Sequence, residues 1–176
     1  MPATELNEFV LRKINLPKKM WGVSERNLRD AVRISHEGFM REWLSLWSIT
    51  GSKRPDLFLF GDDAHTLFAA TMQAVARRGI DLYTFHPGEI DIALDRNPGL
   101  KSEWYEMPLI GIYSFFESTS YDYRTRHFLY NLIKHRWFNQ KPTVLSTSLS
   151  IQAIPEYMQE GEIIGGFLKE AEKIQT

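Results

Sequence analysis

The sequence predicts an α/β fold, a three-layer α/β/α domain in which helices cover both faces of a parallel sheet. Two observations support this fold class. Short, largely apolar segments have the character of strands that are buried on both faces. They alternate with longer stretches in which apolar residues recur at helical spacing, which is the pattern of a layered α/β domain. The length of 176 residues suits one such domain.

The first part of the chain divides into a lead-in and the start of the core. Residues 1–23 are an N-terminal segment without a clear period, and residues 24–176 are the predicted core domain. A long helix is expected from Ser24 to about Ile49, because apolar residues recur there near helical spacing. These residues are Leu28, Val32, Phe39, Trp43 and Leu46.

The remaining elements alternate along the core. Strands are predicted at residues 57–60, 82–85, 109–113 and 143–147. Helices are predicted at residues 64–78, 88–107 and 121–139, with a break in the second at Asn97-Pro98-Gly99. The tail from Ile151 is expected to be helical, with no further strand after Ile174.

Composition excludes several classes of protein. The chain has 21 Lys and Arg against 22 Asp and Glu, a balance that argues against wide, sequence-blind binding of phosphates. It has no cysteine, which excludes disulfides, zinc–thiolate sites and a cysteine nucleophile. The five histidines lack the spacing of metal ligands, so no metal site is expected. The first residues do not resemble a signal peptide, and we expect a cytoplasmic protein.

Ligands of a parallel sheet bind beyond the carboxyl ends of its strands, so the turn after the first strand is the first candidate site. A phosphate-binding P-loop reads G-x-x-x-x-G-K-[ST]. Here the turn reads Gly61-Asp62-Asp63-Ala64-His65-Thr66 and lacks the second glycine and the lysine. The two aspartates would repel a triphosphate, although their residue type suits a helix N-cap.

Despite this difference, the order and spacing of the elements resemble one ATPase family. Residues 55–80 (PDLFLFGDDAHTLFAATMQAVARRGI) resemble the strand, P-loop and helix of AAA+ ATPases of the DnaC/DnaI helicase-loader and IstB-like family. Residues 106–154 resemble its Walker B strand, long helix and sensor-1 strand. The resemblance spans about residues 15–170 and implies a P-loop NTPase (AAA+)-like fold.

The resemblance also shows what has changed at the nucleotide site. The P-loop lysine aligns with His65, and the hydroxyl that binds Mg²⁺ aligns with Thr66. The Walker B acidic pair aligns with Tyr113 and Ser114, and the sensor-1 asparagine with Ser148. Gly61, His65 and Thr66 would be the remnant of the nucleotide-binding turn. No residue is expected to be catalytic.

These substitutions suggest a pseudo-ATPase. We expect no cofactor, with ATP and Mg²⁺ disfavoured, because phosphoryl transfer depends on lysine, metal ligands and an arginine. The resemblance implies an interaction module in DNA replication initiation or helicase loading that docks on replication proteins and not on a membrane. Two alternatives stay open: an ATP-binding helicase loader with an unusual P-loop, and a module that binds single-stranded DNA.

Two surfaces are candidates for contacts with partners. Phe115, Phe116 and Tyr121 follow the third strand and could anchor an interface, or could instead fill the vacated nucleotide pocket. The predicted helix 121–139 carries basic residues that could hold single-stranded DNA, although a solvated helix face explains them as well. These residues are Arg124, Arg126, Lys134 and Arg136.

Overall fold

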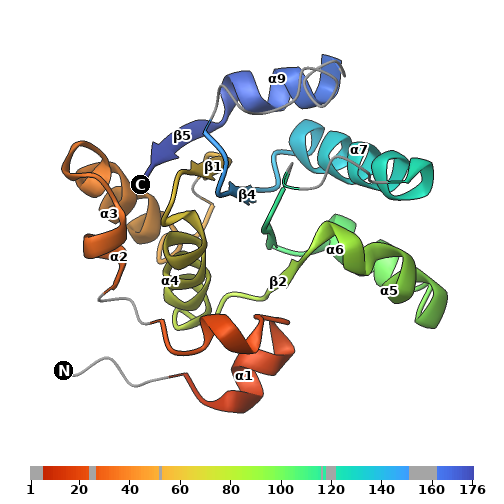
Figure 1. The fold of residues 1–176 in the computed structure, drawn as a ribbon, viewed down its shortest axis with the longest axis horizontal. Coiled ribbons are helices and arrows are strands. Elements are labelled where there is room, and N and C mark those ends of the chain that lie inside the picture. The colour runs from red at the N-terminus through yellow and green to blue at the C-terminus, as the bar shows by residue number, and fades with distance from the viewer. Residues whose placement is uncertain (1–5, 24–26, 52, 116, 118–121, 151–161) are drawn as a thin grey trace.

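The computed structural model describes residues 6–23, 27–51, 53–115, 117, 122–150 and 162–176. Within these residues, five parallel strands form one sheet in the order β2-β3-β4-β1-β5 (Figure 1). The strands are β1 (Leu57–Phe60), β2 (Leu82–Phe85), β3 (Leu109–Ile112), β4 (Thr143–Thr147) and β5 (Glu172–Gln175). The predicted parallel sheet is confirmed, and the first four strands lie where the sequence places them.

Strand β1 lies between β4 and β5 in the sheet. Leu57 lies opposite Val144 of β4 on one side and Glu172 of β5 on the other. Alternate residues of β1 face opposite layers, since Leu57 and Leu59 belong to one hydrophobic cluster and Phe58 to the other. This double burial explains why the strand is continuously apolar.

Helices cover both faces of the sheet, as expected for a three-layer fold (Figure 1). The layer that packs on Leu57 and Leu59 contains α1 (Glu8–Lys13), α2 (Asn27–Ala31), α3 (Ile34–Leu46) and α4 (Ala64–Ala76). The layer that packs on Phe58 contains α5 (Ile90–Arg96), α6 (Leu100–Glu106), α7 (Tyr123–Phe138) and α9 (Glu162–Glu170). Short 3-10 helices are formed by Lys18–Met20 and Pro87–Glu89.

The N-terminal segment is part of the core layer where it is described. Leu11, Ile14, Leu16 and Met20 are buried in the same cluster as β1 and α4. The Thr84 hydroxyl also donates to the carbonyl of Ile14 (3.0 Å), which fixes the segment to β2. No helix among the described residues is long and apolar enough to cross a membrane.

The long helix predicted from Ser24 to Ile49 is wrong, because the chain forms α2 and α3 instead. Arg33 lies between them in an extended conformation (φ −62°, ψ 144°) and occupies the N-cap position of α3. The interruption lets both short helices pack against α4. Apolar residues keep a helical period across the break, and neither Gly nor Pro marks it, so the pattern alone predicts one helix.

The absence of a strand after Ile174 is also wrong. Glu172–Gln175 pairs in parallel with β1 as the edge strand β5. Only Ile174 of this strand is fully buried. Its other residues are polar, as is common at the edge of a sheet, so the segment lacks the apolar run that identifies a central strand.

Candidate functional site

The turns that follow β1, β3 and β4 meet at one edge of the sheet, because the three strands are parallel and adjacent. The turn after β1 leads into α4, which begins at Ala64. Asp63 occupies the N-cap position of α4, but its side chain makes no capping hydrogen bond. Asp63 therefore stands at the N-cap, as its residue type suits, but its side chain does not cap the helix, and Asp62 and Asp63 are exposed at the mouth of the turn.

This turn is closed by a residue that follows β5. The Asp63 N–H donates to Oγ1 of Thr176 (3.1 Å), and the Thr176 N–H donates to the carbonyl of Phe60 (3.0 Å). Gly61 has φ +114°, and a Cβ at this position would lie 2.5 Å from Thr176 Oγ1. In a P-loop the backbone N–H groups of this turn bind phosphate oxygens. Here one of those donors is already engaged by the protein itself.

Glu117 links the other positions that the resemblance singles out. Its Oε1 lies 3.4 Å from Nε2 of His65 and accepts a hydrogen bond from the Ser148 N–H (2.6 Å). The P-loop lysine position and the sensor-1 position are thus joined through a single carboxylate. His65 Nδ1 is buried and has no hydrogen-bond partner in the part of the chain that the structure describes.

The surroundings of Glu117 favour its ionised form. Burial acts to raise its pKa, but hydrogen bonds from Ser148, the charge of His65 and a hydrogen bond from Ser114 outweigh burial, so the pKa is lowered. The site therefore holds a carboxylate where a nucleotide would bring its own negative charge. The sequence alone does not single out Glu117, because its contacts to His65 and Ser148 come from distant parts of the chain.

The two positions that align with the Walker B acidic pair carry no carboxylate. Tyr113 is buried, packs against the rings of Phe68 and His86, and donates its hydroxyl to Glu89 (3.4 Å). Burial and the nearby carboxylate of Glu89 raise the Tyr113 pKa, so the phenol stays neutral. Ser114 is buried with φ +54°. No group of three potential metal ligands occurs among the described residues, and Thr66 is half-buried on the first turn of α4.

Phe115 is buried at 3% exposure in the cluster that contains Phe128 and Leu129. Its N–H also donates to the carbonyl of Ser146 (2.8 Å) on β4. Burial of the ring argues against Phe115 as an exposed interface anchor and makes it part of the core that packs on α7. Phe116 and Tyr121, the other two candidates for this interface, lie outside the described residues.

The four basic residues of α7 do not form one surface. Arg124 pairs with Asp95 (2.9 Å) and Asp91 (3.5 Å) of α5. Arg126 is exposed, and Lys134 is half-buried with its ammonium 5.9 Å from the centre of the Tyr130 ring.

The assignment of Arg136 to a nucleic-acid surface is wrong, because its side chain is fully buried. Its guanidinium instead ties α6 to the start of β4. It donates to the carbonyls of Trp104 (2.9 Å), Tyr105 (3.4 Å), Met107 (2.7 Å) and Pro142 (2.7 Å) and to the hydroxyl of Thr143 (3.0 Å). Burial lowers the Arg136 pKa to about 10, so the side chain remains charged at neutral pH.

Comparisons with known proteins agree with this architecture. No protein-family model matches the sequence, and a search of curated proteins gives no match. Among solved structures, the DnaC helicase loader is similar with a TM-score of 0.72 and 16% identity, over 90% of this chain and 99% of that chain. The structure of DnaI is similar with a TM-score of 0.70 and 16% identity, over 92% of this chain and 91% of that chain.

A third similar structure is the replication initiator DnaA bound to AMPPCP and single-stranded DNA, with a TM-score of 0.66 and 13% identity. The match covers 92% of this chain and 50% of that chain. At these identities the likeness concerns the fold. The chain has the AAA+ fold of P-loop NTPases that its sequence resemblance implies.

Proposed function

We propose that the chain is a non-catalytic AAA+-like module, a pseudo-ATPase, that docks on replication proteins during replication initiation or helicase loading. One observation carries the proposal: the protein's own groups occupy the edge of the sheet where such a fold would bind a nucleotide. Thr176 accepts a hydrogen bond from the Asp63 N–H in the turn after β1. Glu117 pairs with His65 and accepts a hydrogen bond from the Ser148 N–H.

The chemistry of phosphoryl transfer supports the same proposal. Transfer needs a lysine on the phosphates, ligands for Mg²⁺ and an arginine that stabilises the transferring group. His65 is paired with Glu117, and Tyr113 and Ser114 provide no carboxylate. The resemblance to AAA+ helicase loaders implies that the arginine presented to a neighbour's nucleotide would fall near Gly165 and Gly166, where the sequence has none. We therefore expect no Mg²⁺-dependent hydrolysis of ATP.

The class of partner is inferred from proteins of the same fold. One of them is a helicase loader, and another is a replication initiator bound to single-stranded DNA. A fold that keeps its surfaces without its nucleotide chemistry is suited to bind such proteins. We expect this binding to take place in the cytoplasm.

A binding experiment separates this proposal from an ATP-binding helicase loader. The purified chain is mixed with the replicative helicase, helicase loader and initiator of the same cell, and complexes are measured by light scattering after gel filtration. We expect a complex with at least one of them, with equal affinity in the presence and absence of Mg²⁺–ATP. His65→Ala and Thr66→Ala should leave it unchanged. A complex that requires ATP and is lost in His65→Ala would overturn the proposal.

Single-stranded DNA is tested in the same set of experiments. Of the four basic residues expected on α7, Arg136 is buried and Arg124 is paired with carboxylates. We therefore expect weak binding of a labelled oligothymidylate by fluorescence anisotropy, and little difference between the wild type and Arg126→Gln. Tight, salt-dependent binding that is lost in this variant would favour the nucleic-acid function instead.

A further inference from the structure

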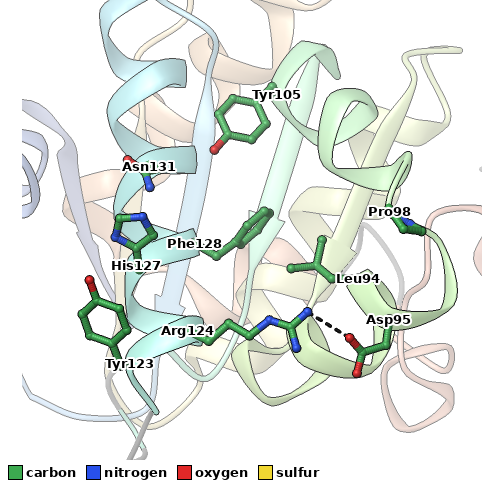
Figure 2. Close-up of a pocket in the computed structure, with 9 residues that line it drawn as sticks. All are labelled: Leu94, Asp95, Pro98, Tyr105, Tyr123, Arg124, His127, Phe128 and Asn131. Atoms are coloured by element: carbon green, nitrogen blue, oxygen red, sulfur yellow. Dashed lines mark hydrogen bonds and ion pairs between the residues drawn. The ribbon is translucent and has the colours of Figure 1, made fainter.

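A pocket opens between α5, α6 and α7 (Figure 2), and it is lined by residues other than Gly61, His65, Glu117 and Ser148. We call it the α5–α7 pocket, and its volume is about 560 Å³. This size lies within the range of small-ligand sites. The residues that matter for its chemistry are Asp95, Tyr105, Tyr123, Arg124, His127 and Phe128.

Aromatic rings form much of the pocket wall. Tyr105 of α6 meets Phe128 of α7 edge to face, with ring centroids 6.3 Å apart. Tyr123 stacks on His127 at 5.7 Å on the same helix. Tyr123 is 74% exposed, an unusual position for a large ring that has no further cover in the described structure. Exposed aromatic faces attract cations through the ring quadrupole.

Asp95 lines the pocket, and the carboxylates of Asp91 and Asp122 lie close to Arg124, which also lines it. Asp91 and Asp95 lie on α5, and Asp122 caps α7 through the Thr125 N–H (2.7 Å). A hydrogen bond shared with Asp122, burial and the Asp122 charge raise the Asp91 pKa, because the two acidic side chains lie close together. Arg124 is the cation that pairs with Asp91 and Asp95, so two carboxylates share one guanidinium.

Arg124 shows which chemistry this pocket accepts. Its guanidinium reaches from α7 across to Asp95 on α5 (Figure 2), with Nη2 at 2.9 Å from Oδ1 of Asp95 and Nε at 3.5 Å from Oδ1 of Asp91. A guanidinium is planar, pairs with carboxylates and stacks on aromatic faces. The pocket offers both kinds of contact to a second guanidinium. Phosphate groups would be repelled by the same carboxylates.

We propose that the α5–α7 pocket binds an arginine side chain of a partner protein, against Tyr123 and the carboxylate of Asp95. In the free chain Arg124 pairs with Asp95, so it competes with the incoming arginine. The proposal depends on the docking function proposed above in one respect, namely that the partner is a protein. The chemistry of the pocket does not depend on whether the nucleotide site is active.

The test uses a small probe and the complete chain. N-acetyl-arginine amide is titrated into the ¹⁵N-labelled protein and followed by NMR, with N-acetyl-citrulline amide as the uncharged analogue of similar shape. We expect saturable shifts of amides in α5 and α7, and at least fivefold weaker binding of the citrulline probe. Tyr123→Ala should weaken binding of the arginine probe about threefold, because an exposed ring is lost from the site.

Arg124→Gln is the decisive variant, and Arg126→Gln is its matched control. Both remove one charge from α7, but only Arg124 lines the pocket. We expect Arg124→Gln to strengthen binding of the arginine probe about threefold, and Arg126→Gln to change it by much less. The proposal would be overturned by equal effects of the two variants, by shifts confined to residues outside α5, α6 and α7, or by the absence of saturable shifts. An oligothymidylate that shifts the same amides at lower concentration than the arginine probe would also overturn it.

Failure of this test leaves the proposed function distinguishable. Titration of the same labelled protein with Mg²⁺–ATP reports on the amides of Gly61 to Thr66, which lie in a different part of the fold. If the arginine probe does not bind and Mg²⁺–ATP does not bind either, only the inference about this pocket is wrong. ATP binding at the turn after β1 would instead contradict the proposed pseudo-ATPase.

Discussion

Arg136 provides a stringent test of the packing between α6, α7 and β4, and Arg136→Met is the informative substitution. Methionine has a similar length and no hydrogen-bond donor. Four of the hydrogen bonds that the guanidinium donates are 2.7–3.0 Å long, three of them to backbone carbonyls. Hydrogen bonds to a charged group contribute about 1.5–3 kcal/mol each. The desolvation cost of a buried charge offsets several kcal/mol of that sum, so a net loss of about 3–5 kcal/mol is expected.

The loss is measured as the free energy of unfolding in urea at 25 °C. Arg136→Lys should lose less, because an ammonium keeps the charge and can satisfy up to three of the acceptors. Arg126→Met on the same helix is the control, and because Arg126 is exposed it should change the free energy by less than about 0.5 kcal/mol. A loss below about 1 kcal/mol for Arg136→Met would refute the assignment of Arg136 as a buried tie between these elements.

Three further predictions concern stability. Phe115→Ala should cost about 3–5 kcal/mol in urea unfolding, as for other buried rings, whereas an unchanged stability would restore Phe115 as an interface candidate. Burial raises the Asp56 pKa to about 6 in spite of a hydrogen bond from the Thr143 N–H (2.8 Å). The folded state therefore holds a proton that the unfolded chain releases, and stability should fall by about 2–3 kcal/mol as pH rises from about 4 to about 7. Asp56→Asn should remove this slope, and a slope that persists would exclude Asp56 as its source. Gly61→Ala should cost about 1–3 kcal/mol because of its positive φ, and a melting temperature equal to that of the wild type would contradict the close contact with Thr176.

Strands 57–60, 82–85 and 143–147 could be predicted to the residue, because buried parallel strands have a strong local pattern. The break at Arg33 and the strand Glu172–Gln175 could not. The break depends on how two helices fit against α4. The strand depends on a free edge of β1, which supplies the pairing that its own polar sequence does not indicate.

The candidate site was predictable as a set of positions but not as a set of contacts. The turn containing His65 and the position of Ser148 follow from order and spacing along the chain. Their connection through Glu117 and the closure of the turn by Thr176 arise from residues far apart in sequence. Tertiary contacts of this kind leave no local pattern.

Arg136 did leave a local signal. It follows Leu129, Leu132 and Ile133 at helical spacing, and all three are buried on the same side of α7. A charge on an apolar stripe indicates a buried, hydrogen-bonded side chain more directly than it indicates a nucleic-acid surface. Arg136 lies beside Lys134 and His135, and this basic run suggested an exposed position instead.

The melting temperature with and without Mg²⁺–ATP shows whether the edge of the sheet near Gly61 binds a nucleotide. A ligand at about 100 times its dissociation constant adds about 2.7 kcal/mol to the stability of the folded state. For a chain of this size that corresponds to a rise of about 5–10 °C. We predict that millimolar Mg²⁺–ATP changes the melting temperature by less than about 1 °C, well below that rise. A rise of several degrees that disappears in His65→Ala would contradict the proposed function.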